Sequence, residues 1–100
     1  MRFLTLDLIK KRLRIGNDFE DEVLELYGES AEKEALDYMQ RSLESLYDEF
    51  GEVPHDIILA CLSRVATSYK YQEEITDRNL SRLPYMWEAK LTKYIPPEKL

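Results

Sequence analysis

Apolar residues recur at helical spacing near the start of the chain. Leu6, Ile9 and Leu13 are three and four positions apart, which places them on one face of a helix. The hydroxyl of Thr5 is placed to accept a hydrogen bond from an early backbone amide, so we expect the helix to start there. Gly16 follows soon after the last apolar residue, and we expect it to supply the backbone freedom that ends the helix.

A second and longer helix is predicted from Phe19 to about Met39. Asn17 and Glu20 have the spacing of a capping box at its start. A stripe at every fourth position carries the residues Phe19, Val23, Tyr27, Ala31, Ala35 and Met39. Gly28 lies near the small residues of this stripe, and small side chains let another helix approach closely. Glycine costs about 1 kcal/mol relative to alanine inside a helix, so we expect close packing or a local bend there.

Two further helices are predicted in the middle of the chain. Ser42 is a candidate cap for a short helix from Leu43 to Phe50. The alternative is one unbroken helix up to Phe50, which would be long for a chain of this size, so we prefer the break. Pro54 is suited to the first position of the next helix. That helix is apolar nearly all round from Ile57 to Tyr69, as expected of an element at the centre of a bundle.

The C-terminal part of the chain predicts an arm that ends in a short helix. Residues 75–83 have little periodicity and read as a loop or an extended arm. A short helix is expected from Tyr85 to about Tyr94, with Trp87 and Leu91 on one edge. No strand pattern is present. The sequence therefore predicts one all-α domain over residues 1–100, with four or five helices and a C-terminal arm from 75 to 100.

Charge and composition limit the classes of function. With 44% hydrophobic and 34% charged residues, a folded chain is favoured over a disordered one. The 14 basic and 20 acidic residues give a net charge of -6, whereas duplex-binding domains usually carry an excess of Lys and Arg. General nucleic-acid affinity is therefore disfavoured. An acidic surface would still let DNA pass without sticking, because it repels phosphate.

No membrane partner is expected. The longest apolar run, Ile57 to Leu62, is far shorter than a membrane-spanning helix. The first residues lack the hydrophobic core of a signal peptide, so we expect the chain to be made in the cytoplasm.

Residue types that serve catalysis or bind metals form no recognisable site. His55 is the only histidine, and zinc normally takes four ligands, so an exposed His55 at the start of a helix is the favoured interpretation. Cys61, the only cysteine, lies within the apolar helix, where a buried and unreactive thiol is favoured. We therefore expect no catalytic residue, no metal and no cofactor.

The first two predicted helices have oppositely charged ends where they meet. The basic end of the first helix carries Lys11, Arg12 and Arg14. The acidic start of the second helix carries Glu20, Asp21, Glu22 and Glu25. Charges of these signs suit the helix dipoles, and a solvated surface is the simplest explanation. The alternative is that the two ends form a contact between neighbouring copies of the chain.

Aromatic residues concentrate in the C-terminal third. A candidate docking element for another protein is formed by Leu83, Pro84, Tyr85 and Trp87. Tyrosine and tryptophan are frequent anchors of protein interfaces. The alternative is that this element covers the domain's own core.

Four segments spread over the chain carry a recognisable pattern. They are Leu4-Thr5-Leu6-Asp7 through Leu13-Arg14-Ile15, Ala35 to Tyr38 with Arg41-Ser42-Leu43, the apolar helix ending in Tyr69 and Tyr71, and Leu83-Pro84-Tyr85 with Leu91 and Tyr94. In this order, they resemble the head–tail connector (adaptor) proteins of tailed bacteriophages and prophages, also labelled DNA-packaging proteins. Members of that family often carry Pro at the position of Ser42, and an Arg that this chain lacks after Tyr71.

The resemblance implies an all-α structural protein of the virion, at the head–tail interface. Copies would form a ring of about a dozen subunits beneath the portal protein, although closed symmetry alone does not fix the number. The ring would extend the DNA channel, through which DNA passes without specific binding, and receive a head-closure or tail-joining protein. The basic end of the first helix would then meet the acidic start of a neighbour's second helix.

The runner-up function is a small DNA-binding or regulatory protein of the helix-turn-helix type. The turn at Gly16 between two predicted helices suggests it. A recognition helix that opens with the acidic residues of 18–22 would repel phosphate, which disfavours this alternative.

Overall fold

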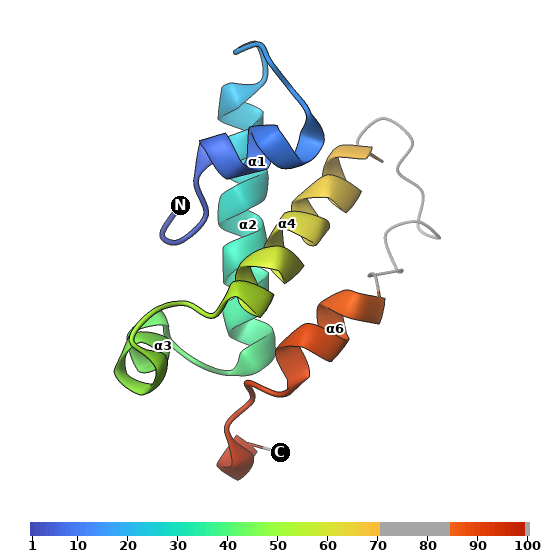
Figure 1. The fold of residues 1–100 in the computed structure, drawn as a ribbon. Coiled ribbons are helices and arrows are strands. Elements are labelled where there is room, and N and C mark those ends of the chain that lie inside the picture. The colour runs from blue at the N-terminus through green and yellow to red at the C-terminus, as the bar shows by residue number, and fades with distance from the viewer. Residues whose placement is uncertain (71–84, 100) are drawn as a thin grey trace.

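The computed structural model describes residues 1–70 and 85–99, and these form an all-α fold (Figure 1). The helices are α1 (Leu6–Leu13), α2 (Asp21–Met39), α3 (Leu43–Phe50), α4 (His55–Lys70) and α6 (Tyr85–Thr92), followed by the 3₁₀ helix η1 (Pro97–Lys99). The described part of the chain contains no strand, and the predicted all-α class is confirmed. The predicted loop over residues 75–83 lies outside the described residues.

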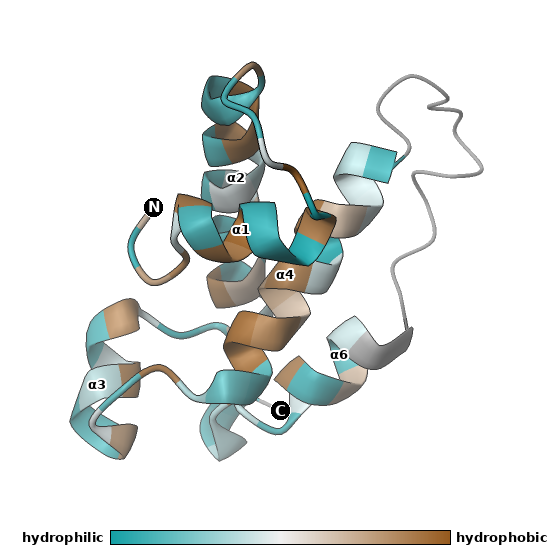
Figure 2. Ribbon diagram, turned by 45° about the horizontal axis from the view of Figure 1, so that its top comes forward, coloured by the Kyte–Doolittle hydropathy of each residue, from teal (hydrophilic) through white to brown (hydrophobic). Residues whose placement is uncertain are grey.

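Helix α4 is the centre of the bundle, as its apolar sequence predicts. It packs against α2 most extensively and also contacts α1 and α6 (Figure 1). Its fully buried residues include Ile57, Cys61 and Val65. Figure 2 shows hydrophobic residues along α4, with hydrophilic ones prominent on the outer side of α1. None of the helices in the described residues is long and apolar enough to cross a membrane.

Two side-chain caps start helices where the sequence predicts them. The Oγ1 of Thr5 accepts a hydrogen bond of 3.1 Å from the backbone amide of Leu8, at the start of α1. The Oγ of Ser42 accepts one of 3.2 Å from the amide of Ser45, at the start of α3. The preferred break before α3 is therefore confirmed. Such caps depend on neighbouring residues alone, which makes them readable from sequence.

Helix α1 ends at Leu13, but the residue that ends it is not the predicted one. Arg14, not Gly16, adopts the left-handed conformation, with a φ of 61°. The amide of Arg14 bonds to the carbonyl of Lys11 and that of Ile15 to the carbonyl of Lys10, at 3.3 and 2.9 Å, which is a Schellman closure. Ile15 packs on the core just beyond it. These contacts offset the strain of the left-handed conformation at Arg14, so α1 ends before Gly16 is reached.

The predicted start of α2 is also wrong. Asn17 does not cap the helix, because its Oδ1 accepts a hydrogen bond of 3.1 Å from the amide of Phe19 in a local turn. The N-cap is Glu20, which makes no side-chain capping bond, and α2 begins at Asp21. Phe19 therefore precedes the helix and is 92% exposed. The start of α4 is shifted by a single residue, to just after Pro54.

The predicted stripe of α2 is buried only in its C-terminal half. The residues of α2 that are buried are Leu24, Gly28, Ala31, Glu32, Ala35 and Met39. Val23 remains exposed, whereas the small residues allow close approach as expected. A methyl group added to Gly28 would lie 2.9 Å from Cδ1 of Ile9 and would also collide with Sδ of Met1. The N-terminal segment and α1 are therefore packed directly on Gly28.

Candidate assembly surface

The oppositely charged ends of α1 and α2 are joined within one chain by a lysine. Lys10 Nζ lies 2.8 Å from Oδ1 of Asp18 and 2.9 Å from Oδ1 of Asp21. The hydrogen bonds to Asp18 and Asp21 raise the pKa of Lys10, and the bond to Lys10 lowers the pKa of Asp18. Part of the charge pattern thus serves the chain's own fold.

Three residues of the candidate contact are engaged in such internal pairs. Asp21 is bound by Lys10, and Glu20 accepts a hydrogen bond of 2.6 Å from the hydroxyl of Tyr69 on α4. Lys11 Nζ lies 3.1 Å from Oδ2 of Asp7 one turn earlier, in a solvent-exposed pair. Exposed pairs of this spacing contribute about 0.3–0.5 kcal/mol, so Lys11 remains available to a partner.

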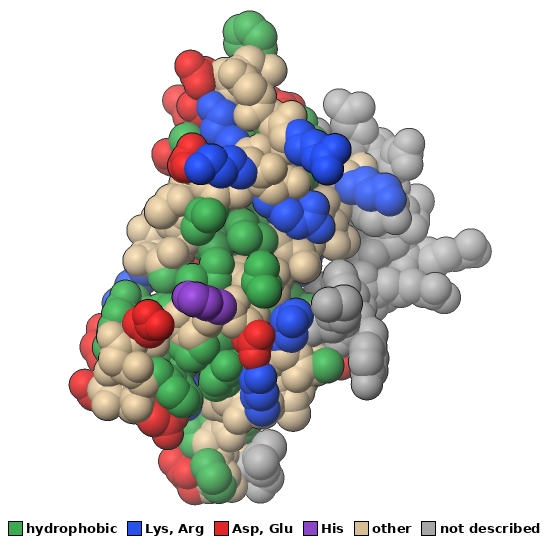
Figure 3. All heavy atoms as spheres, viewed as in Figure 1, with side chains coloured by type: hydrophobic (Ala, Val, Ile, Leu, Met, Phe, Trp, Pro, Cys, Tyr) green, Lys and Arg blue, Asp and Glu red, His purple; other side chains and the backbone are tan. Residues whose placement is uncertain are grey.

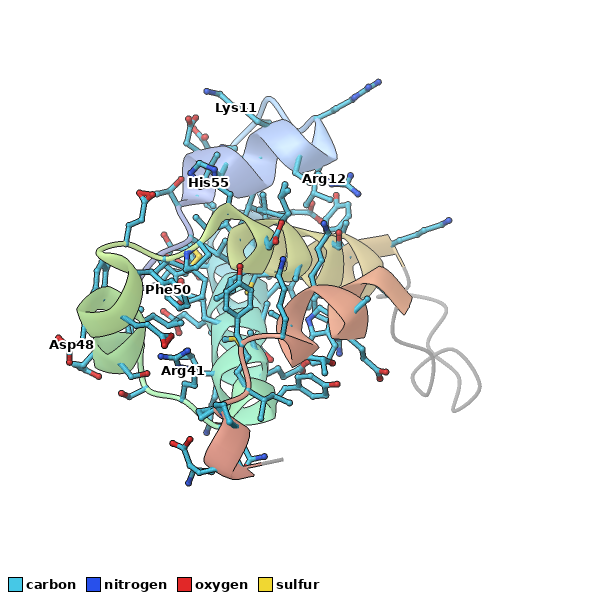
Figure 4. The ribbon with its side chains drawn as sticks, turned by 60° about the horizontal axis from the view of Figure 1, so that its bottom comes forward. Lys11, Arg12, Arg41, Asp48, Phe50 and His55 are labelled. Carbon is cyan, nitrogen blue, oxygen red and sulfur yellow. The ribbon has the colours of Figure 1, made fainter. Side chains whose placement is uncertain are left out.

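The other four residues of the candidate contact are exposed. Within residues 1–70 and 85–99, no ion pair or hydrogen bond engages the side chains of Arg12, Arg14, Glu22 and Glu25. Figure 3 shows blue Lys and Arg side chains gathered over α1, with red acidic ones at the edge of the same end of the molecule. Figure 4 shows Lys11 extending away from the bundle. These four charges therefore have no role in the contacts that hold the described part of the chain together.

Large apolar side chains are exposed near both charged groups, which the sequence did not indicate. Phe19 and Leu26, the latter 65% exposed, lie with Val23 at the N-terminal end and on the outer side of α2. Leu8 on α1 and Leu59 on α4, the latter 50% exposed, are exposed on two helices that contact each other. Asn17 and Asp18, residue types that are common in turns, are the sequence signal that Phe19 lies outside the helix.

Glu32 holds the N-terminal segment on α2. Its buried carboxylate, 4% exposed, accepts hydrogen bonds from three consecutive backbone amides. The distances are 2.9 and 3.0 Å from Arg2, 2.7 Å from Phe3 and 2.7 Å from Leu4. Leu4 is thereby placed in the core. The sequence sign of this role is an acidic residue among the small positions of α2, and it does not reveal what the carboxylate binds.

Arg41 joins α3 to the C-terminal segment. Its Nη1 lies 2.8 Å from Oε2 of Glu49 and 3.4 Å from the carbonyl oxygen of Tyr94. Its Nε and Nη2 donate to Oγ and the carbonyl oxygen of Ser45, at 3.1 and 3.2 Å. The guanidinium also lies 5.5 Å from the centre of the Phe50 ring (Figure 4). Arg41 therefore holds the segment at Tyr94 against α3.

A model of one protein family matches almost the whole chain. It is described as phage gp6-like head-tail connector protein, and it matches residues 3–94. The chain belongs to this family. Searches of curated proteins and of solved structures found no match. As a member of a head–tail connector family, the protein is a structural component of a phage virion.

The structure describes only part of this connector's candidate docking element. Leu83 and Pro84 lie outside the described residues, and Tyr85 is the first residue of α6. Trp87 is 3% exposed, and its ring centroid lies 5.0 Å from that of Tyr38. The Tyr38 hydroxyl lies 2.9 Å from Oγ1 of Thr92. The indole of Trp87 therefore belongs to the connector's own core.

The cysteine and the histidine lie where the sequence predicts. Cys61 is fully buried, and burial, followed by the charges of Glu32 and Glu34, raises its pKa to about 12. The thiol is therefore unreactive at neutral pH. His55 is exposed at the start of α4. Among the described residues, His, Cys, Asp and Glu do not gather in any group of three that could hold a metal ion.

Proposed function

We propose that this connector forms a closed ring beneath the portal protein and extends the DNA channel. The ring then receives a head-closure or tail-joining protein. The family match over residues 3–94 carries the proposal, because it spans nearly the whole chain. A ring requires a heterologous contact, in which one face of each subunit meets a different face of the next.

The proposed subunit contact uses the charges that the fold leaves exposed. Arg12 and Arg14 at the end of α1 meet Glu22 and Glu25 of the neighbouring copy's α2. Their exposure, and the lack of internal pairs for them within the described residues, support this assignment. Lys11 adds to the basic side, whereas Glu20 and Asp21 contribute mainly through their internal bonds. Because the two groups carry opposite charges, two basic groups or two acidic groups repel each other, whereas a basic and an acidic group attract.

The candidate docking element remains part of the proposal on sequence grounds. Leu83, Pro84 and Tyr85 form the contact with the portal or the tail-joining protein, and Trp87 anchors α6, the helix that begins at Tyr85. Substitution of Tyr85 by Ser, with ring formation as the control, tests it. Loss of portal or tail-joining partner binding with intact rings supports this role, and unchanged binding of both partners contradicts it.

DNA passes through the ring without specific binding. The net charge of -6 supports this, since phosphate is repelled by an acidic surface. Binding of purified connector to a DNA duplex, strong at low salt and lost at high salt, would instead favour a helix-turn-helix DNA-binding protein.

One experiment tests the proposed function. The purified protein, alone and mixed with portal assemblies, is examined by light scattering and negative-stain electron microscopy. Rings, or portals capped by the connector, are expected. A monomer that does not bind the portal would contradict the proposed function.

A further inference from the structure

We propose that an apolar strip on α2 docks on an apolar patch of α1 and α4 in a second copy of this chain. The α2 strip consists of Phe19, Val23 and Leu26. The α1–α4 patch is the surface that carries Leu8 and Leu59, which are exposed on two helices that contact each other. The inference rests on the proposed ring and names the contact that would hold its subunits together.

The α2 strip lies on the side of the helix that the fold does not use. Leu26 lies opposite the side that buries Leu24, Ala31 and Ala35, as the helical period requires, and Val23 lies between that side and Leu26. Exposed side chains of this size at neighbouring positions mark interaction sites more often than isolated ones do. The strip is therefore an apolar surface without a partner among the described residues.

Phe19 is held in place although its ring is exposed. The turn that carries it is closed by the bond from its amide to Asn17. The same turn is tied to α1 by the bond between Asp18 and Lys10. A side chain on a fixed backbone loses less entropy on binding than one on a loose loop, so Phe19 is suited to be the anchor of an interface.

Charge complementarity identifies the occupant as a second copy. Glu22 and Glu25 flank the α2 strip, whereas Lys11 and Arg12 flank Leu8 on α1. Two copies with a net charge of -6 repel each other in general, so an association needs a local match of this kind. Strip-to-strip pairing would place acids against acids, and only strip-to-patch pairing brings opposite charges together.

The two apolar surfaces lie on different sides of one molecule. Figure 3 shows hydrophobic side chains gathered between the basic residues of α1 and the single histidine, His55, which is one turn before Leu59 on α4. The α2 strip lies on the side of α2 that faces away from its packed partners. One chain therefore cannot cover its own patch with its own strip, and the contact must run from copy to copy.

Single substitutions test the contact through self-association of the purified protein. Phe19→Ser removes the centre of the strip and Leu59→Ser removes half of the patch. Sedimentation velocity over a range of concentrations is expected to show association at least about tenfold weaker for Phe19→Ser, since burying a phenylalanine changes an equilibrium constant by more than that factor. Tyr47→Ser is the matched control, because Tyr47 is an exposed aromatic residue on α3. Circular dichroism confirms that each variant is folded.

Mixing the two variants gives a result that only a heterologous contact produces. The Phe19→Ser chain keeps its patch, and the Leu59→Ser chain keeps its strip. We therefore expect each to be largely monomeric alone and the mixture to form dimers that grow no further. Reversal of Glu22 and Glu25 to Lys should weaken assembly, and a partner carrying Lys11→Glu and Arg12→Glu should restore it. Asp48→Lys, on the exposed side of α3 (Figure 4), is the charge control.

The outcomes separate this inference from the proposed function. If the Phe19 and Leu59 variants assemble as the wild type does, the inference is overturned. Rings bound to portals would still support the proposed function. The inference is also overturned if the wild-type chain stays monomeric at every concentration and neither substitution changes how the chain caps portals. Failure of the wild type to bind portals and to form rings would overturn both.

Discussion

The carboxylate of Glu32 makes a sharp test of how the N-terminal segment is held. Replacing it by glutamine keeps its size but removes its charge and turns one acceptor oxygen into a donor group. The amides of Arg2, Phe3 and Leu4 all point at this carboxylate, at 2.7–3.0 Å. At least one amide must then lose its acceptor or face another donor.

The expected loss of stability depends on the number of hydrogen bonds to Glu32 and on whether the N-terminal segment can leave the core instead. A hydrogen bond to a charged group contributes about 1.5–3 kcal/mol, and a buried amide without an acceptor costs about 1–3 kcal/mol. The segment can escape these costs by leaving the core, but it then exposes Leu4, whose burial is worth about 1.5–3 kcal/mol. We expect Glu32→Gln to lower the free energy of unfolding by about 2–4 kcal/mol.

Urea unfolding followed by circular dichroism measures this loss, and hydrogen exchange locates it. The amides of Phe3 and Leu4 should exchange faster in the variant, well beyond the change at α4. Glu25→Gln is the control, because Glu25 is an exposed acid on α2 and makes no ion pair or side-chain hydrogen bond within the described residues. A Glu32→Gln protein within about 0.5 kcal/mol of the wild type, with unchanged exchange in the N-terminal segment, would refute the reasoning.

Three further predictions follow from particular contacts. Arg41→Lys loses the bonds that reach Ser45 and Tyr94 at once, so we expect about 1–2 kcal/mol lower stability and faster amide exchange at residues 94–95; unchanged exchange there would contradict this role. Gly28→Ala gains helix propensity but crowds Ile9, and a net loss of about 1 kcal/mol in urea unfolding is expected; a more stable protein would show that the contact yields easily. Asp56, whose pKa is lowered by its hydrogen bond to Lys93, stabilises the fold above pH 3.8 and loses that effect as the pH falls through its folded pKa. The melting temperature of Asp56→Asn should therefore fall below that of the wild type at pH 7 but approach it in strong acid, and a deficit that persists at low pH would count against the pair.

Where the structural signal is local, the sequence was sufficient. The caps at Thr5 and Ser42 and the break before α3 need only residues within one turn. The central position of α4 follows from its composition, because a helix that is apolar on most sides must be covered on most sides. The burial of Cys61 and the exposure of His55 follow from their places in that helix. The family pattern also lies in the order of local segments.

Only the tertiary structure decided which surfaces are used inside the chain and which are left outside. A helical period relates positions to each other but does not say which side faces the core. The stripe predicted for α2 therefore includes Phe19 and Val23, although the fold buries only its C-terminal half. The left-handed cap of α1 at Arg14 depends on Ile15 packing on the core. The role of Glu32 depends on a segment almost thirty residues away along the chain. The same holds for the charges. Both groups are visible in the sequence, but folding decides that Lys10 binds Asp18 and Asp21, whereas Arg12, Arg14, Glu22 and Glu25 remain exposed.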